Sequence, residues 1–305
     1  MRPLITKASA IYGMGDALNE RAFLVSYCRQ KHIPRSSITI YTEKYWWMFE
    51  GLGFGRELVR SNFKGLTAFR NFGRYNIDKI FNLDKLDICI ALNAGIRYNF
   101  DVCVALPEYQ LPDIKLPEKF ITINTGYGEF SGKPGEKDIV CTKSWPIHHW
   151  TEFVKKIGVP CVQIGAGPSC QPVDGVALNL IDKLSIKESA AVMRKALFHV
   201  DMEGGLPILN QHLGKKSVVL FGSTAIQNQG RSFNLNIRCS TCMPCYEWGS
   251  KRMNKLFAPK NQLPCGVRCM EEIKPDFVID AIEKTNWLEK GAFVDEAYFE
   301  KIEEE

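Results

Sequence analysis

The feature that most constrains the fold of this sequence is a repeated alternation of short apolar runs with segments of helical length. Short apolar runs predict strands over residues 4–12, 37–41, 88–92, 102–106, 120–124, 159–164, 198–200 and 217–221. Helices are expected over 17–31, where Leu18, Ala22, Val25 and Cys28 share one face, over 186–196, and from Pro275 onward. Strands separated by helix-length segments form parallel βαβ units, so the sequence predicts an α/β protein.

A proline-spaced segment divides this alternation into two halves. Pro107, Pro112 and Pro117 recur every five residues, which neither a helix nor a central strand tolerates. We therefore expect two tandem Rossmann-like domains, at 1–107 and 119–290, joined by a linker over 108–118 and followed by an acidic tail over 291–305. A chain of 305 residues is long enough for both domains.

Charge and hydropathy limit the classes of binding partner and the location that the sequence favours. The formal net charge is +5, and no block of five or more basic residues occurs, so nothing favours binding to nucleic acid. The N-terminus lacks the pattern of a secretory signal, and no apolar stretch approaches the roughly 18 residues that span a bilayer. The sequence predicts a cytoplasmic protein without a transmembrane segment, while peripheral membrane association and oligomerisation stay open.

Three polar segments follow predicted strands and are candidates for a binding site. Gly15 and Asp16 follow the first strand, although Asp16 could equally be a helix N-cap. Thr142 and Lys143 open the second half, where Lys143 is either a partner for a diphosphate or a solvated surface lysine. A third segment combines an acidic residue, two glycines and two hydroxyls, which would suit the binding of phosphate and ribose. The alternative for this segment is a glycine turn capped by the acidic residue. Its residues are Glu203, Gly204, Gly205, Leu206, Ser223 and Thr224.

Cysteine spacing is the most specific local signal. Of the eleven cysteines, six are scattered and predicted to be buried thiols, whereas five fall within residues 239–269. We expect four thiolates, Cys242, Cys245, Cys265 and Cys269, to close a shell around a structural iron or zinc ion, with Cys239 as an alternate ligand. Reduced cysteines without a metal are the alternative.

Taken in order, these segments resemble the heptosyltransferase-like family of glycosyltransferases (glycosyltransferase family 9). The shared motifs are Met14-Gly15-Asp16, Lys143-x-Trp145-Pro146 with Trp150, Gly205-Leu206, Phe221-Gly222-x-Thr224, and the ending from Cys242 to Val278. The resemblance runs from residue 11 to about 285. It implies a GT-B-like fold with a cysteine-rich metal knuckle in the second domain. The Glu-Gly-Gly-Leu segment of this chain is closer to that of the autotransporter heptosyltransferases, which carry a cysteine-bound iron.

The resemblance also implies roles. Asp16 would be the general base, Lys143 would neutralise the departing nucleoside diphosphate, and the remaining residues of the segments would hold a nucleotide-sugar donor, ADP-heptose in this family. The acceptor would be a glycan or protein hydroxyl. Two positions depart from the family: Glu203 replaces an aspartate and Ile208 replaces a histidine. A non-catalytic carbohydrate-binding or assembly protein with a structural metal site therefore remains the alternative function.

Overall fold

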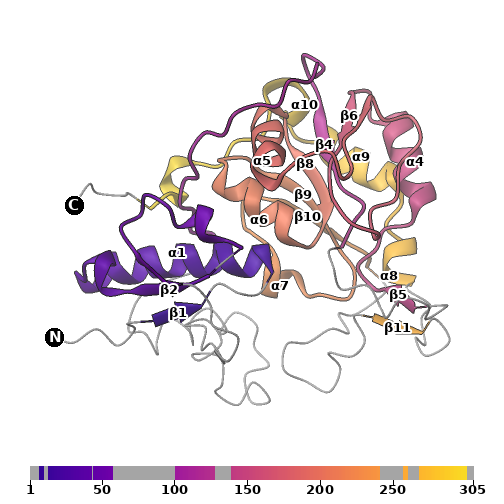
Figure 1. Ribbon diagram of the computed structural model, residues 1–305. Helices are drawn as coiled ribbons and strands as arrows, with labels where there is room; N and C mark the ends of the chain where they lie inside the picture. Colours follow the sequence, from indigo (N-terminus) through magenta and orange to yellow (C-terminus); the bar gives the residue numbers. More distant parts are fainter. Residues whose placement is uncertain are drawn as a thin grey trace. The chain divides into compact units, whose positions relative to one another are not determined.

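A computed structural model describes residues 7–9, 13–42, 44–57, 100–127, 139–240, 257–259 and 268–300 (Figure 1). The chain divides into two compact units, one of Met1–Leu106 with Asp295–Glu305 and one of Pro107–Val294. Within the described residues, no helix is both long and apolar enough to cross a membrane.

The first unit contains a parallel three-stranded sheet and a long helix. The strands are β1 (Lys7–Ser9), β2 (Thr39–Tyr41) and β3 (Gly55–Glu57), in the order β1-β2-β3, and the helix is α1 (Met14–Lys31). The 3-10 helices η1 (Arg35–Ser37), η2 (Trp46–Met48) and η7 (Glu296–Tyr298) complete it. The strand predicted over 37–41 forms as β2, which begins at Thr39 instead of at residue 37. The strand predicted over 88–92 lies outside the described residues.

Helix α1 is buried more completely than its sequence predicts. Every residue from Ala17 to Cys28 is buried, rather than the one apolar face expected. Arg21 explains part of this, because its guanidinium donates hydrogen bonds to the carbonyl oxygens of Met48, Val104 (2.6 Å) and Ala105 (2.8 Å). The strand predicted over 102–106 is wrong: only an isolated bridge from Cys103 to Phe299 forms, since Arg21 binds the carbonyls that a ladder would use.

The second unit is built on a six-stranded parallel sheet. Its strands are β4 (Ile121–Ile123), β6 (Cys161–Gln163), β7 (Leu178–Asn179), β8 (His199–Met202), β9 (Ser217–Phe221) and β10 (Leu235–Arg238). Their order is β7-β6-β4-β8-β9-β10, and every pair is parallel. This is the 3-2-1-4-5-6 order of a doubly wound Rossmann sheet, which confirms the predicted α/β class for this unit. A separate antiparallel pair joins β5 (Ile139–Cys141) to β11 (Phe257–Pro259).

Helices cover both faces of this sheet. Helices α5 (Ile186–Lys195) and α6 (Gly205–His212) contact each other and the central strands, while α4 (Ile147–Lys156) and α9 (Pro275–Glu283) contact each other on the opposite face (Figure 1). The short helices α7 (Ile226–Gln229), α8 (Arg268–Glu271) and α10 (Trp287–Lys290) lie in the connections. Local chemistry sets the boundaries, since a Ser185–Glu188 capping box starts α5 and Pro275 occupies the first turn of α9.

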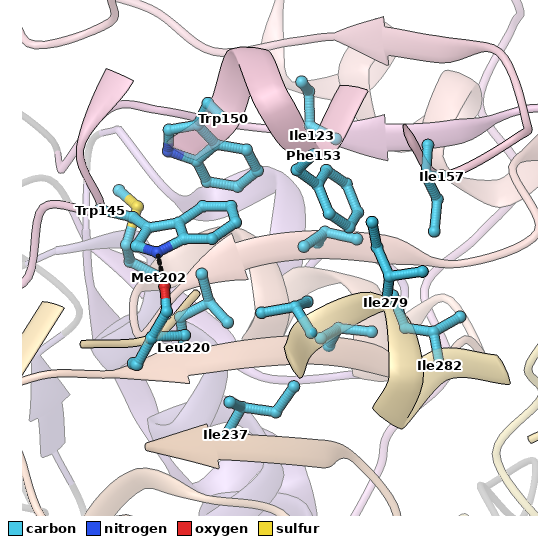
Figure 2. Close-up of a cluster of buried hydrophobic side chains, with 14 of the residues drawn as sticks. Ile123, Trp145, Trp150, Phe153, Ile157, Met202, Leu220, Ile237, Ile279 and Ile282 are labelled. Carbon is cyan, nitrogen blue, oxygen red and sulfur yellow. Dashed lines mark hydrogen bonds between the residues drawn. The ribbon is translucent and has the colours of Figure 1, made fainter. Parts of the chain in front are cut away.

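The core of the second unit lies between the sheet and the pair α4 and α9. Alternate residues of the strands, such as Ile121 and Ile123 or Val218 and Leu220, face it. Aromatic residues of the α4 segment fill it: Trp145 and Trp150 meet edge to face at 4.8 Å, and Phe153 lies beside both (Figure 2). The tryptophans of the Lys-x-Trp-Pro…Trp motif are therefore core residues that fix the turn carrying Lys143.

Candidate functional site

The switch point of the second sheet lies between β4 and β8, where the strand order reverses. In open α/β sheets, ligands bind outside the carboxyl ends of the strands at such a point. Asn124 directly follows β4, Glu203 directly follows β8, and Ser223 lies two residues after β9. Chain topology thus gathers polar residues that are far apart in sequence at one edge of the sheet.

The pair of Lys143 and Glu203 is the centre of the candidate site. Lys143 lies in the turn after β5, and its ammonium forms a salt bridge with the carboxylate of Glu203. The side chains are 15% and 11% exposed, so the pair is largely withdrawn from solvent yet still reachable. The hydroxyl of Thr224, which follows β9, donates to Oε2 of Glu203 at 3.1 Å. Lys143 is therefore not a solvated surface lysine.

A close contact joins the turn after β5 to the turn after β9. The hydroxyl of Thr142 donates to that of Ser223 at 2.7 Å, and both residues are buried. A Cβ atom at Gly222 would lie 2.4 Å from the carbonyl oxygen of Thr142 and 2.7 Å from Sδ of Met270. Only glycine fits at this position, and its absence of a side chain lets the two turns approach.

Helix α6 begins beside this cluster. Gly204 is its N-cap, with extended backbone and no neighbour closer than 3.8 Å to a Cβ placed there, so the space around a Cβ at the N-cap is open. The first amides of a helix, at its positive end, attract anions. A shallow hollow next to them is lined by Glu203, Gly204, Ile208 and Arg231, among others.

Arg231 is a residue that sequence reasoning missed. It is 2% exposed, and its Nε donates to Oε1 of Gln211 at 2.8 Å. The residue brings a buried cation to the same hollow that Ile208 lines. No sequence signal identified it, because it belongs to the loop after α7 rather than to a strand end.

A buried polar network spans the switch point itself. The carboxylate of Asp201, within β8, accepts hydrogen bonds from Nδ2 of Asn124 (3.0 and 3.1 Å) and from the amide of Met202 (2.7 Å). Nε2 of His199 lies 3.3 Å from the same carboxylate, and Nδ1 of His199 lies 3.0 Å from the hydroxyl of Thr122. Burial raises the pKa of Asp201, against the effect of His199 and these hydrogen bonds.

Two thiols, of Cys141 and Cys170, lie at the described part of this edge. Cys141 precedes Thr142, and Cys170 lies 3.4 Å from Oδ1 of Asn124. Burial raises the pKa of Cys141, and burial together with the charge of Asp201 raises the pKa of Cys170 to about 11. Both thiols are therefore protonated near neutral pH and are poor nucleophiles.

Gly15 and Asp16 belong to the first unit, in the first turn of α1. The N-cap of α1 is Gly13, whose carbonyl oxygen accepts from the amide of Ala17 at 3.1 Å. Asp16 is therefore the third residue of the helix and not its N-cap. Its carboxylate is half-buried at the positive end of α1, a position that stabilises negative charge.

Two of the five clustered cysteines are described. Cys239 directly follows β10 and Cys269 lies in α8, and both are buried in the same hydrophobic cluster of the second unit. Cys242, Cys245 and Cys265 lie outside the described residues. Of the scattered cysteines that are described, all but the half-buried Cys170 are buried, and none of the described cysteines forms a disulfide.

The site and the sheet together define an α/β protein with a Rossmann-type domain whose polar groups converge at the switch point. Comparison with known proteins gives further information about the fold. No family model and no curated protein matches the sequence. Solved structures do match, with TM-scores that show a shared fold although the sequence identities are only 12–14%.

The structural neighbours are glycosyltransferases. The iron-containing dodecameric glycosyltransferase TibC from enterotoxigenic E. coli matches with a TM-score of 0.66 and 14% identity, over 93% of this chain and 76% of TibC. A glycosyltransferase of family 9 from Veillonella parvula matches with a TM-score of 0.55 and 12% identity, over 92% and 96% of the two chains. The E. coli ADP-heptose lipopolysaccharide heptosyltransferase II matches with a TM-score of 0.52 and 12% identity, over 93% and 98%. The chain therefore has the α/β fold of the family 9 heptosyltransferases, which is GT-B-like.

Proposed function

We propose that this protein is a glycosyltransferase that moves a sugar, heptose in the first instance, from a nucleoside diphosphate donor to a hydroxyl of a glycan or protein. The observation that carries the proposal is the cluster at the carboxyl ends of β8 and β9: Lys143 paired with Glu203, flanked by Thr224 and by the first amides of α6. The fold supports it, since TibC has been solved with ADP-D-β-D-heptose.

Each residue has a role that its chemistry supports. Departure of a nucleoside diphosphate builds negative charge on the phosphates, and a largely buried ammonium beside helix N-terminal amides stabilises that charge. Lys143 would provide the ammonium, and Gly204 and Gly205 the amides. Glu203 would accept hydrogen bonds from hydroxyls of the donor sugar, and the hydroxyl of Thr224, which donates to Glu203, would accept one.

Asp16 would act on the acceptor. A carboxylate within hydrogen-bond reach of the acceptor hydroxyl takes its proton as the oxygen attacks the anomeric carbon. The C–O bond to the diphosphate breaks as the new glycosidic bond forms, and the diphosphate leaves with the bonding electrons. Asp16 lies in the first unit, which we infer to be the acceptor side.

The cysteine cluster would hold a structural metal. Cys242, Cys245, Cys265 and Cys269 would supply the four thiolates, with Cys239 as an alternate ligand. Cys239 and Cys269 are both buried in the hydrophobic cluster of the second unit. Iron or zinc bound there would organise the segment between β10 and α8 without taking part in transfer. Elemental analysis of the purified protein identifies the ion.

Calorimetry and a turnover assay test the function together. Binding of ADP and ADP-heptose is measured first, because it does not depend on the acceptor. We then follow release of nucleoside diphosphate from a panel of nucleotide sugars in the presence of cell-envelope glycans and proteins. Lys143→Met should weaken ADP binding by about 10- to 100-fold, since it removes a charge-assisted contact, whereas exposed Lys155→Met should not.

Asp16→Asn separates catalysis from binding. It should leave ADP affinity unchanged and lower turnover by about 10²–10⁴-fold, while Asp113→Asn, an exposed control, should change neither. Full turnover in Asp16→Asn would show that Asp16 is not the base. Donor binding without turnover in the wild-type protein would favour the non-catalytic alternative.

A further inference from the structure

Two histidines and a glutamate converge on the second unit, outside the candidate site and outside the cysteine cluster. His148 and His149 lie in the first turn of α4, and Glu271 is the last residue of α8. Nε2 of His148 lies 3.8 Å from Oε2 of Glu271, and Nε2 of His149 lies 3.7 Å from the same oxygen. One ligand atom from each residue falls within 4.8 Å of the other two.

The buried histidine of this cluster lacks a full set of partners. The His149 side chain is 4% exposed, and its Nδ1 has no hydrogen-bond partner among the described residues. Its Nε2 donates to the backbone carbonyl oxygen of Glu271 at 3.1 Å. Two imidazole nitrogens and a carboxylate oxygen therefore meet in one place. A cation bound there would take the lone pair of Nε2 in place of this hydrogen bond, with the ring proton moved to the unpartnered Nδ1.

The distances agree with ligation of a small divalent ion. Nitrogen and oxygen ligands bind Zn²⁺ at about 2.0–2.2 Å, which places neighbouring ligands of a tetrahedral ion roughly 3.4 Å apart. The spacings of 3.7 and 3.8 Å are slightly wider. The side chains of His148 and Glu271 are 63% and 50% exposed, so both can move inward at little cost. Their exposure also leaves room for water as a further ligand.

We propose that His148, His149 and Glu271 form a binding site for a divalent transition-metal ion of the zinc class. Two imidazoles with one carboxylate favour Zn²⁺, Co²⁺ or Ni²⁺ over Mg²⁺ and Ca²⁺, which prefer oxygen ligands. The site is separate in ligand chemistry from the thiolate cluster, since it uses nitrogen and oxygen only.

Such an ion would clamp α8 to α4 next to the candidate site. The adjacent Met270 places its Sδ against Gly222, which in turn contacts the turn of Thr142 and Lys143. A protein contact already ties the same segments, because Nε1 of Trp145 donates to the carbonyl oxygen of Ile273 at 2.7 Å. The ion would add a second tie and hold the turn that carries Lys143.

Equilibrium dialysis of the purified full-length protein against Zn²⁺, followed by elemental analysis, tests the site. The variants are His148→Gln, Glu271→Gln and the double variant, and all change exposed side chains, so the fold should be kept. Exposed His32→Gln and Glu283→Gln are matched controls. Any zinc taken up by the cysteines is common to all of these proteins, so only the difference between them is read.

The wild-type protein and both controls should bind one more zinc equivalent than the double variant. Each single variant should weaken this binding at least about tenfold. Zinc should also raise the melting temperature of the wild-type protein and not that of the double variant. Equal zinc content and affinity in the wild-type protein and the double variant would overturn the proposal, whatever the outcome of the transfer assay.

Discussion

The paired tryptophans of the second core allow a sharp test of how its polar atoms are satisfied. Trp145 and Trp150 are 3% and 0% exposed, and they contact each other edge to face. They differ in one respect: Nε1 of Trp145 donates to the carbonyl oxygen of Ile273 at 2.7 Å, whereas Nε1 of Trp150 is buried with no partner among the described residues (Figure 2).

Replacing each tryptophan by phenylalanine removes the same indole atoms from the same core. The loss of buried apolar surface is therefore similar in Trp145→Phe and Trp150→Phe, and it largely cancels when the two are compared. Trp145→Phe also removes a hydrogen bond and leaves the carbonyl oxygen of Ile273 without it, which costs about 1–3 kcal/mol. Trp150→Phe removes an N–H group that has no protein acceptor, and no such cost arises.

We expect Trp145→Phe to lower the free energy of unfolding by about 1–3 kcal/mol more than Trp150→Phe. Urea unfolding followed by circular dichroism and by the fluorescence of the remaining tryptophans measures both, and matching midpoints from the two probes test for a single transition. An equal effect of the two substitutions, or a larger one for Trp150→Phe, would refute the reasoning.

Three further predictions concern the second unit. Glu203→Gln should tighten ADP binding by about fivefold to tenfold in calorimetry, because it releases Lys143 and removes a negative charge beside the phosphates. Weaker binding would show that Glu203 holds the nucleotide instead. Gly222→Ala should lower the free energy of unfolding in urea by about 1–3 kcal/mol, since its Cβ would overlap the carbonyl oxygen of Thr142. Gly204→Ala should lower it by less than about 1 kcal/mol. Equal effects of the two substitutions would contradict this reasoning. Burial lowers the pKa of Lys215 to about 8, so between pH 8 and 10.5 the unfolded chain binds a proton at this lysine that the folded chain lacks. The difference in stability between the wild-type protein and Lys215→Met should therefore shift in favour of the wild-type protein as the pH rises over this range, and a difference that stays constant would refute it.

Hydrophobic patterning predicted four of the six strands of the second sheet, β4, β6, β8 and β9, and missed β7 and β10. Runs such as 217–221 are buried on both faces and bounded by polar residues, so their period and length identify them. The same reasoning failed over 102–106, where the backbone carbonyls bind the guanidinium of Arg21, about 80 residues earlier in the chain. A side chain that takes the place of a neighbouring strand leaves no pattern in the local sequence.

The candidate site was predictable to the extent that it follows strand ends. Lys143, Glu203 and Thr224 each come shortly after a strand, and the structure brings them together. Asp201 and Asn124 could not be paired in advance, because their contact depends on β8 lying next to β4 in the sheet. Strand order is a property of the whole fold, and no local signal encodes it.

The position of Arg231 changes how the departure at Ile208 is understood. Read along the sequence, isoleucine in place of the family's histidine removes a ring donor from the region expected to bind phosphate. In the structure, Ile208 and Arg231 line the same hollow beside Gly204. Arginine carries a permanent charge, so the hollow holds a cation that comes from a different loop. The positive charge of Arg231 next to the first turn of α6 does not depend on which residue occupies position 208.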